Sequence, residues 1–265
     1  MTFTTLEKKD LAGLHPREIR ALIRERKWTG KTADLAEGYV QANLAAVPSA
    51  DAFDFLLFCV RNPKPCPLLE VVEPGFPIVR EVAPGADLRT DLPKYRVYEG
   101  GRCVAEVEDV SDHWREDLVG FLLGCSYSFL GSLRKANVAP NASCLYTTRV
   151  PCVPAGRFTG PMLVSMRPIR KDQVVRAVQV TSRFPATHGA PVHIGDPSAL
   201  GIRNLDDVAL SSRRVEVKAD QVPVFWACGC TPQAVALEAR LELMITHSPG
   251  CCLVTDKLSE ELAAF

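Results

Sequence analysis

The stretch Val222-Pro-Val-Phe-Trp-Ala-Cys-Gly-Cys-Thr-Pro232 decides how this chain is expected to fold. Its first six residues form a short β-rich run, which predicts a buried strand. Thr231 can cap a helix and Pro232 suits the first helical position, so a helix is predicted from there to about Leu243. A strand, a tight turn and a capped helix in direct succession indicate an α/β protein.

The turn between that strand and that helix is also a candidate binding site. The free N–H groups of a first helical turn, together with the helix dipole, favour a carboxylate or a phosphate. Cys228, Gly229 and Thr231 are therefore predicted to help bind an anionic substrate.

Outward from this stretch, helical and strand patterns alternate along the chain. We predict an α/β fold with a mixed sheet, helices on both faces and two α/β lobes in one compact unit spanning residues 1–265. Four more helices are predicted. One begins at Pro16; a second follows the cap Ser49 and turns Phe53 and its aromatic neighbours inward; the other two cover about 111–125 and 172–180. The predicted strands are 68–72, 78–82, 95–98, 103–107 with a hairpin turn at Gly100-Gly101, 162–166, 214–217 and 252–255.

The composition excludes several classes of protein. With 265 residues, 47% of them hydrophobic, the chain must bury a large core. Its 31 basic residues balance 31 acidic ones, so no global field attracts a nucleic acid or an anionic membrane. The first fifteen residues lack the apolar stretch of a signal peptide, and no run suits a membrane span. We expect a cytoplasmic protein whose partner is a small molecule.

The ten cysteines do not indicate a disulfide framework or a zinc site. They lie in apolar contexts, in a chain too long to need crosslinks. Neither Cys228 with Cys230 nor Cys251 with Cys252 has zinc-knuckle spacing. We expect most of them to be reduced and buried.

Nucleotide and hydrolase signatures are missing. Gly30-Lys31-Thr32 resembles the end of a phosphate-binding loop, but the required upstream glycine and strand are absent. No dinucleotide-binding glycine turn or nucleophile elbow occurs either. We therefore predict chemistry without a cofactor.

The segment from Phe184 to Asn204 is predicted to be a long loop, because prolines and glycines recur throughout it. Loops of this length in compact domains are usually functional. His193, steered by Asp196, is predicted to exchange protons with substrate, and His188 to assist. Two alternatives stay open: the side chains only bond to loop backbone, or the three together hold a metal.

Three arginines are candidates for binding a substrate carboxylate: Arg61, Arg167 and Arg183. A guanidinium offers a carboxylate two parallel hydrogen bonds, which lysine cannot do. The alternative for each is a structural or surface salt bridge.

Several motifs together resemble the D-glutamate cyclase family, whose bacterial members are often labelled hydro-lyases. The resemblance runs in consistent order from about Pro16 to Asp256. It is carried by residues 38–44, 54–67, 89–96, 124–129, 182–197, 223–229, 231–233 and 245–250. It implies a two-lobed α/β fold and conversion of D-glutamate to 5-oxo-D-proline with loss of water.

The residues fit that chemistry without ATP, because closure of a five-membered ring has a high effective molarity. Two rivals remain. One is a hydro-lyase that acts on another small hydroxy or amino acid, and the other is a non-catalytic protein that binds small carboxylates. Apolar segments such as 53–58 suit a subunit contact as well as a core, and we expect a homodimer.

Overall fold

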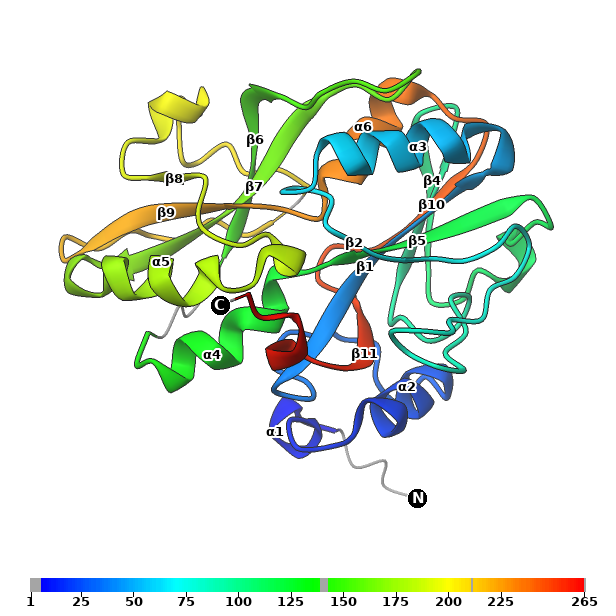
Figure 1. Ribbon diagram of the computed structural model, residues 1–265, viewed down its shortest axis with the longest axis horizontal. Helices are drawn as coiled ribbons and strands as arrows, with labels where there is room; N and C mark the ends of the chain where they lie inside the picture. The colour runs from blue at the N-terminus through cyan, green and yellow to red at the C-terminus, as the bar shows by residue number, and fades with distance from the viewer. Residues whose placement is uncertain (1–5, 139–142, 211, 265) are drawn as a thin grey trace.

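The computed structural model describes residues 6–138, 143–210 and 212–264, and it contains two antiparallel sheets (Figure 1). The first sheet has seven strands in the order β2-β5-β1-β10-β3-β4, with β11 also paired to β1. Its strands are β1 (Tyr39–Pro48), β2 (Leu68–Val71), β3 (Tyr95–Glu99), β4 (Arg102–Val107), β5 (Leu118–Gly124), β10 (Met244–His247) and β11 (Leu253–Leu258). The second sheet has the order β6-β7-β9-β8, with β6 (Cys144–Pro151), β7 (Pro161–Arg170), β8 (His193–Ile194) and β9 (Gln221–Ala227).

Strand β1 is the centre of the first sheet, and its two edges are paired differently. Along one edge β5 pairs without interruption, from Ala42 opposite Gly124 to Pro48 opposite Leu118. Along the other edge β10 and β11 follow each other end to end. Between them residues 248–252 leave the sheet, so the pairing of β1 is broken on that side.

Helices pack around both sheets (Figure 1). They are α1 (Lys8–Leu11), α2 (Pro16–Arg24), α3 (Ser49–Arg61), α4 (Leu130–Lys135), α5 (Val174–Ser182) and α6 (Thr231–Ala239). Short 3-10 helices add η1 (Ser111–His113), η2 (Ser126–Phe129), η3 (Lys171–Gln173), η4 (Pro185–Thr187), η5 (Pro197–Leu200) and η6 (Ser259–Leu262). None of the helices in the described ranges is long and apolar enough to cross a bilayer.

One hydrophobic cluster joins the two sheets beneath α3. It contains Phe121 of β5 and Phe225 of β9 together with Phe55 and Phe58 of the helix. The Phe55 ring lies edge-on to Phe121, with ring centroids 4.7 Å apart, and edge-on to Phe158 at 5.2 Å. Because burial of this aromatic surface stabilises both sheets at once, they are held in a fixed relation.

The predicted α/β class is confirmed, and so are several of its elements. The helices at Pro16 and Thr231, the hairpin at Gly100-Gly101 and the strand at 222–227 all form. The helix predicted at 49–61 also forms, but Phe53 points outward with 73% of its surface exposed. Its place on the helix puts it on the face opposite Phe55 and Phe58.

Three other predictions were wrong. The long helix expected at 111–125 is the short η1 followed by strand β5, because the apolar run 118–124 is buried between β1 and β2. The expected strand 78–82 makes only an isolated bridge at Ile78, since the Glu70 carboxylate accepts the backbone N–H groups of residues 80–82. Residues 214–217 form no strand with any described partner.

Candidate functional site

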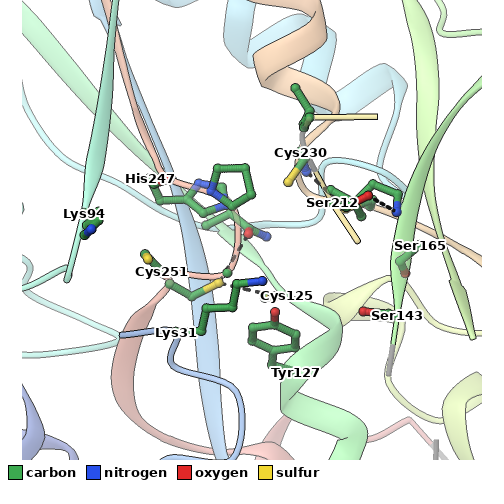
Figure 2. A pocket seen from close by; sticks show the side chains of 18 of the residues that line it. Lys31, Lys94, Cys125, Tyr127, Ser143, Ser165, Ser212, Cys230, His247 and Cys251 are labelled. Carbon is green, nitrogen blue, oxygen red and sulfur yellow. Dashed lines mark hydrogen bonds between the residues drawn. The ribbon is translucent and has the colours of Figure 1, made fainter. Parts of the chain in front are cut away.

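A cavity of about 360 Å³ lies where residues 248–252 leave the first sheet, facing the second sheet. Its size is typical of a site for a small molecule. Figure 2 shows side chains from separate segments converging on it. The first sheet and its loops contribute Lys31, Asn43, Lys94, Arg96, Glu106, His247 and residues 248–252; the second contributes Leu145, Ser165 and Arg167; Cys125–Tyr127, Ser143, Leu210, Ser212, Cys228 and Cys230 complete the lining with Thr29 and Gly30.

Arg167 of β7 is the most unusual residue of this cavity. It is 2% exposed, and its guanidinium donates to the hydroxyls of Ser165, at 2.9 Å, and Ser126, at 3.1 Å. It also lies over the rings of Phe129 and Trp226, at 5.9 and 5.8 Å from their centroids. No carboxylate of the described residues forms an ion pair with it. A buried guanidinium keeps its charge, so Arg167 is a cation without a carboxylate partner at the wall of a cavity.

The turn between β9 and α6 forms the neighbouring part of the wall. The Thr231 hydroxyl donates to the carbonyl of Cys228 at 2.7 Å and accepts the N–H of Leu163 at 3.2 Å. Thr231 is the first residue of α6 and not the cap before it, and its side chain fastens the start of the helix to β7 and to the preceding turn. The predicted strand–turn–helix arrangement therefore borders the cavity.

Gly229 allows this turn to lie directly against β1. A Cβ atom at this position would overlap the side-chain amide of Asn43. That amide cannot easily move, because it donates to the carbonyls of Gly124, at 2.9 Å, and Leu123, at 3.4 Å. Only glycine fits between the helix start and the broken edge of β1.

Cys228 has an electrostatic environment that favours its thiolate. Hydrogen bonding from Cys230 lowers the pKa of the Cys228 thiol below its ordinary value, and the nearby charge of Arg167 lowers it further against the opposing effect of burial. One of these bonds is the Cys230 N–H, which lies 3.4 Å from the Cys228 sulfur. A thiolate at a helix start beside an arginine is the form that accepts protons and attacks electrophiles.

The opposite wall carries most of the remaining charge. Arg96 donates to Glu106 at 2.8 Å, which lowers the pKa of that carboxyl, and the Ser248 hydroxyl donates to Glu106 at 3.1 Å. Lys31 and Lys94 also line the cavity. With Arg167 there are four lining cations and one lining carboxylate, so the cavity suits an anion.

Lys31 is brought to the cavity by a contact between distant segments. The N–H and the hydroxyl of Thr32 both donate to the carbonyl of Gly250, at 2.9 and 3.2 Å. Gly250 has a φ of +88°, and a side chain there would press on Lys31 and on the Tyr127 hydroxyl. Glycine at 250 therefore leaves space for both groups beside the cavity.

His247 is a neutral imidazole at this site. Its Nδ1 lies 3.3 Å from the carbonyl of Leu44, which can only accept, so Nδ1 carries the proton. Burial lowers the pKa of His247 to about 4. The ring is thus uncharged at neutral pH.

Of the residues predicted to act on substrate, the structure brings Arg167 and Cys228 into the cavity, with Gly229 and Thr231 shaping its wall. His193 lies outside the lining residues, half-exposed against Phe225. Its Nε2 is 2.6 Å from the backbone carbonyl of Asp196, not from the carboxylate.

The other predicted residues also lie outside the cavity lining. The Asp196 carboxylate accepts hydrogen bonds from the N–H and the hydroxyl of Ser198, and Asp196 thereby caps η5. His188 is buried with a left-handed backbone, its Nδ1 is 2.8 Å from the Lys64 carbonyl, and burial lowers its pKa to about 4. Arg183 borders a separate surface hollow at the end of α5, and Arg61 donates to the carbonyl of Pro154. The roles predicted for these residues stay predictions, and the described residues contain no group of three ligands arranged for a metal.

Sequence reasoning missed Asn43, Tyr127 and the role of Lys31. The signal that was present is Gly30-Lys31-Thr32, considered only as a nucleotide loop, together with the turn Ser248-Pro249-Gly250. Neither segment reveals by itself that it contacts the other.

Comparison with known proteins identifies close relatives. A model of the family described as D-glutamate cyclase matches residues 119–256. A Bacillus licheniformis protein named "Putative hydro-lyase" is 54% identical over 94% of this chain and 97% of its own. Proteins with the same designation from a Thermoanaerobacter species (54% identical, 97% of this chain and 99% of that one) and from Bacillus subtilis (52%, 94% and 98%) are similar along nearly their whole length.

Proposed function

This chain belongs to the D-glutamate cyclase family, and we propose that it converts D-glutamate to 5-oxo-D-proline and water in the cavity between its two sheets. The relatives named as hydro-lyases support the loss of water as the reaction class. The identity of the substrate is the part that the proposal adds.

The observation that carries the proposal is the buried charge of Arg167. Removing an ion from water costs several kcal/mol unless a counter-ion compensates it. No carboxylate of the described residues pairs with Arg167, whereas a substrate carboxylate in the cavity would do so with two charge-assisted hydrogen bonds, in addition to the negative charge that the Cys228 thiolate places nearby. We assign the α-carboxylate of glutamate to Arg167.

The second carboxyl group then belongs near the start of α6 and Lys31. Positive potential from the helix start and from the lysine stabilises the charge that develops on the γ-carboxyl oxygens when the ring closes. Arg167 and Lys31 come from different sides of the cavity, which suits a substrate with two separated carboxylates.

Cys228 is a better proton acceptor than His247. The α-ammonium group has a pKa of about 8 or higher, so transfer to an imidazole with a pKa of about 4 is uphill by roughly 5 kcal/mol. The ordinary pKa of a thiol is close to that of an amine, and hydrogen bonding from Cys230 lowers the pKa of Cys228, which makes its thiolate available to accept the proton. We assign the proton transfers to Cys228.

The reaction balances with these groups. The Cys228 thiolate takes one proton from the ammonium, and the free amine attacks the γ-carboxyl carbon to form the carbon–nitrogen bond. One carbon–oxygen bond then breaks. The departing oxygen takes one of the two protons on the ring nitrogen and the proton of the Cys228 thiol, and leaves as water; the lactam keeps its other N–H proton and the thiolate is restored.

The direct test incubates the purified protein with D-glutamate, L-glutamate or 5-oxo-D-proline and follows each by NMR. We expect the lactam to form from D-glutamate. Saturable changes in the ligand's NMR chemical shifts without turnover would show that the protein only binds carboxylates. Turnover of a different hydroxy or amino acid, and not of D-glutamate, would show that it catalyses another hydro-lyase reaction.

The Cys228→Ser variant tests the assignment of the proton transfers. We expect kcat to fall on the order of a hundredfold to ten-thousandfold with little change in KM, because a serine hydroxyl does not ionise near neutral pH and cannot replace the thiolate as a proton acceptor. Cys103→Ser, at an exposed position of β4, is the matched control and should keep full activity. Unchanged turnover in Cys228→Ser would remove the thiolate from the mechanism.

A further inference from the structure

Five of the ten cysteines line the cavity: Cys125, Cys228, Cys230, Cys251 and Cys252. Besides Cys228 and Cys230, which interact within one turn, Cys125 and Cys252 are in contact although they are far apart in the sequence. The Cys252 thiol donates to the sulfur of Cys125 at a distance of 3.5 Å, and it is also 3.5 Å from Oδ1 of Asn43. The proposed reaction uses neither sulfur.

The backbones that carry these two thiols are firmly placed. The N–H of Cys125 donates to the carbonyl of Gln41 at 2.9 Å, at the end of β5. The N–H of Cys252 donates to the Thr32 hydroxyl at 3.0 Å, just before β11. Because β5 and β11 pair with opposite edges of β1, the sulfurs meet across the central strand and not through a flexible loop.

We propose that Cys125 and Cys252 are an oxidisable pair that forms a reversible disulfide when a peroxide enters the cavity. A disulfide requires the sulfurs to approach to about 2.05 Å, a movement of roughly 1.5 Å from their present separation. Rotation of two cysteine side chains can contribute to such a movement, and a cavity on one side of the pair gives them room.

The two sulfurs have different roles in the oxidation. Cys125 is the more accessible, at 8% against 1% exposure for Cys252. Hydrogen bonding to Cys125 and burial raise the pKa of the Cys252 thiol, which keeps it protonated. Cys125 therefore attacks the peroxide oxygen and becomes a sulfenic acid as the oxygen–oxygen bond breaks and water leaves.

The second step forms the bond between the residues. The Cys252 sulfur attacks the sulfenic sulfur, its proton goes to the departing hydroxide, and a second water leaves. Two thiols and one hydrogen peroxide thus give one disulfide and two waters, and a dithiol reductant reverses the change.

The new bond would connect two segments that shape the site. Cys252 ends the loop that borders Lys31, and Cys125 precedes Ser126, whose hydroxyl accepts from Arg167. Drawing the sulfurs together shifts one or both segments, so we expect oxidation to lower turnover. This effect rests on the proposed function, whereas formation of the bond does not.

The test treats the full-length protein with hydrogen peroxide, blocks the remaining thiols and maps the cysteine-containing peptides by mass spectrometry. We expect a Cys125–Cys252 peptide pair, lighter by two hydrogen atoms than the two free peptides, that disappears after dithiothreitol. Cys125→Ser and Cys252→Ser should each abolish this pair, while Cys103→Ser, which removes the exposed thiol, should leave it unchanged.

The buried cysteines Cys59 and Cys66 are an internal comparison, because they interact beneath α3 but do not line the cavity. They should stay reduced at peroxide doses that oxidise the cavity pair. The proposal is overturned if Cys125 and Cys252 remain free thiols while other cysteines react, or if either is crosslinked to Cys228, Cys230 or Cys251 instead. Mapping is independent of activity, so a failed cyclase assay does not affect this result.

Discussion

Replacing Arg167 by methionine should make the protein no less stable while removing its affinity for substrate. Methionine is shorter and uncharged, and its flexible thioether can pack toward the rings of Phe129 and Trp226. The variant loses two hydrogen bonds to serine hydroxyls, each worth roughly 1.5 to 3 kcal/mol. It also no longer has to bury a charge, which costs several kcal/mol. The two changes nearly cancel, and the net effect should lie between none and a gain of about 3 kcal/mol.

The effect on binding has the opposite sign. In the proposed complex, two charge-assisted hydrogen bonds from Arg167 to the α-carboxylate contribute roughly 3 to 6 kcal/mol together. Their loss should raise the dissociation constant of D-glutamate by on the order of a hundredfold to ten-thousandfold. Urea unfolding with and without ligand measures both quantities. At a ligand concentration a hundred times its dissociation constant, the wild type should gain about 2.7 kcal/mol, and the variant should gain about 0.4 kcal/mol or less.

Arg170→Met is the matched control for this experiment. Arg170 is also on β7, but it is exposed and paired with Asp172. Its replacement should leave both stability and ligand shift close to wild type. The reasoning fails if Arg167→Met lowers the free energy of unfolding by more than about 3 kcal/mol and yet retains the stabilisation by ligand. Arg167 would then be a structural residue.

Three other substitutions test separate parts of the site. Gly229→Ala should lower stability by about 1 to 3 kcal/mol in urea unfolding, because the new methyl group overlaps the Asn43 amide; an unchanged midpoint would contradict this close packing. Lys31→Met should raise KM for D-glutamate by roughly tenfold with a near-normal melting temperature. The control Lys171→Met, at an exposed position, should change neither value. Equal KM values in the two variants would show that Lys31 does not bind the substrate. The pKa of His188 is about 4 in the folded protein and about 6.5 when unfolded, so the unfolded state binds more protons between these values and stability falls as the pH decreases through them. Between pH 7 and pH 5, the free energy of unfolding of His188→Gln should therefore fall by about 2 kcal/mol less than that of the wild type. Parallel plots of this free energy against pH would show that the ring is not buried as a neutral group.

Elements specified by neighbouring residues were predictable from the sequence. The β9–α6 unit is an example, because the β-rich run and the helix-starting pair Thr231-Pro232 follow each other closely in the sequence. Strand β5 was not predictable in this way. Its apolar run suits a buried helix as well as a buried strand, and only its pairing with β1 and β2, more than 40 residues away in each case, selects the strand.

The candidate site was predictable only in part, for the same reason. Sequence alone could not rank Arg61, Arg167 and Arg183, since each is an arginine near a proline or a turn. Burial distinguishes them: Arg167 is enclosed at a cavity, while Arg61 bonds to a backbone carbonyl at the surface. The glycine- and proline-rich loop has strong local signals of function, but the cavity is assembled by segments such as Thr32 and Gly250, which are over 200 residues apart.

The break along β1 explains why polar residues are required in an otherwise apolar strand. Backbone groups that lose their ladder partners must find others, since an unpaired buried polar group is costly. At the break the Leu44 carbonyl accepts a hydrogen bond from His247, and the Asn43 side chain bonds to the Cys252 thiol on the interrupted side and to the Gly124 carbonyl on the intact side. His247 and Asn43, which hold the segments around the break, therefore also line the cavity. It follows that the same interruption of pairing creates both the space for a ligand and the need for polar groups around it, so the site is a consequence of how the central strand is completed.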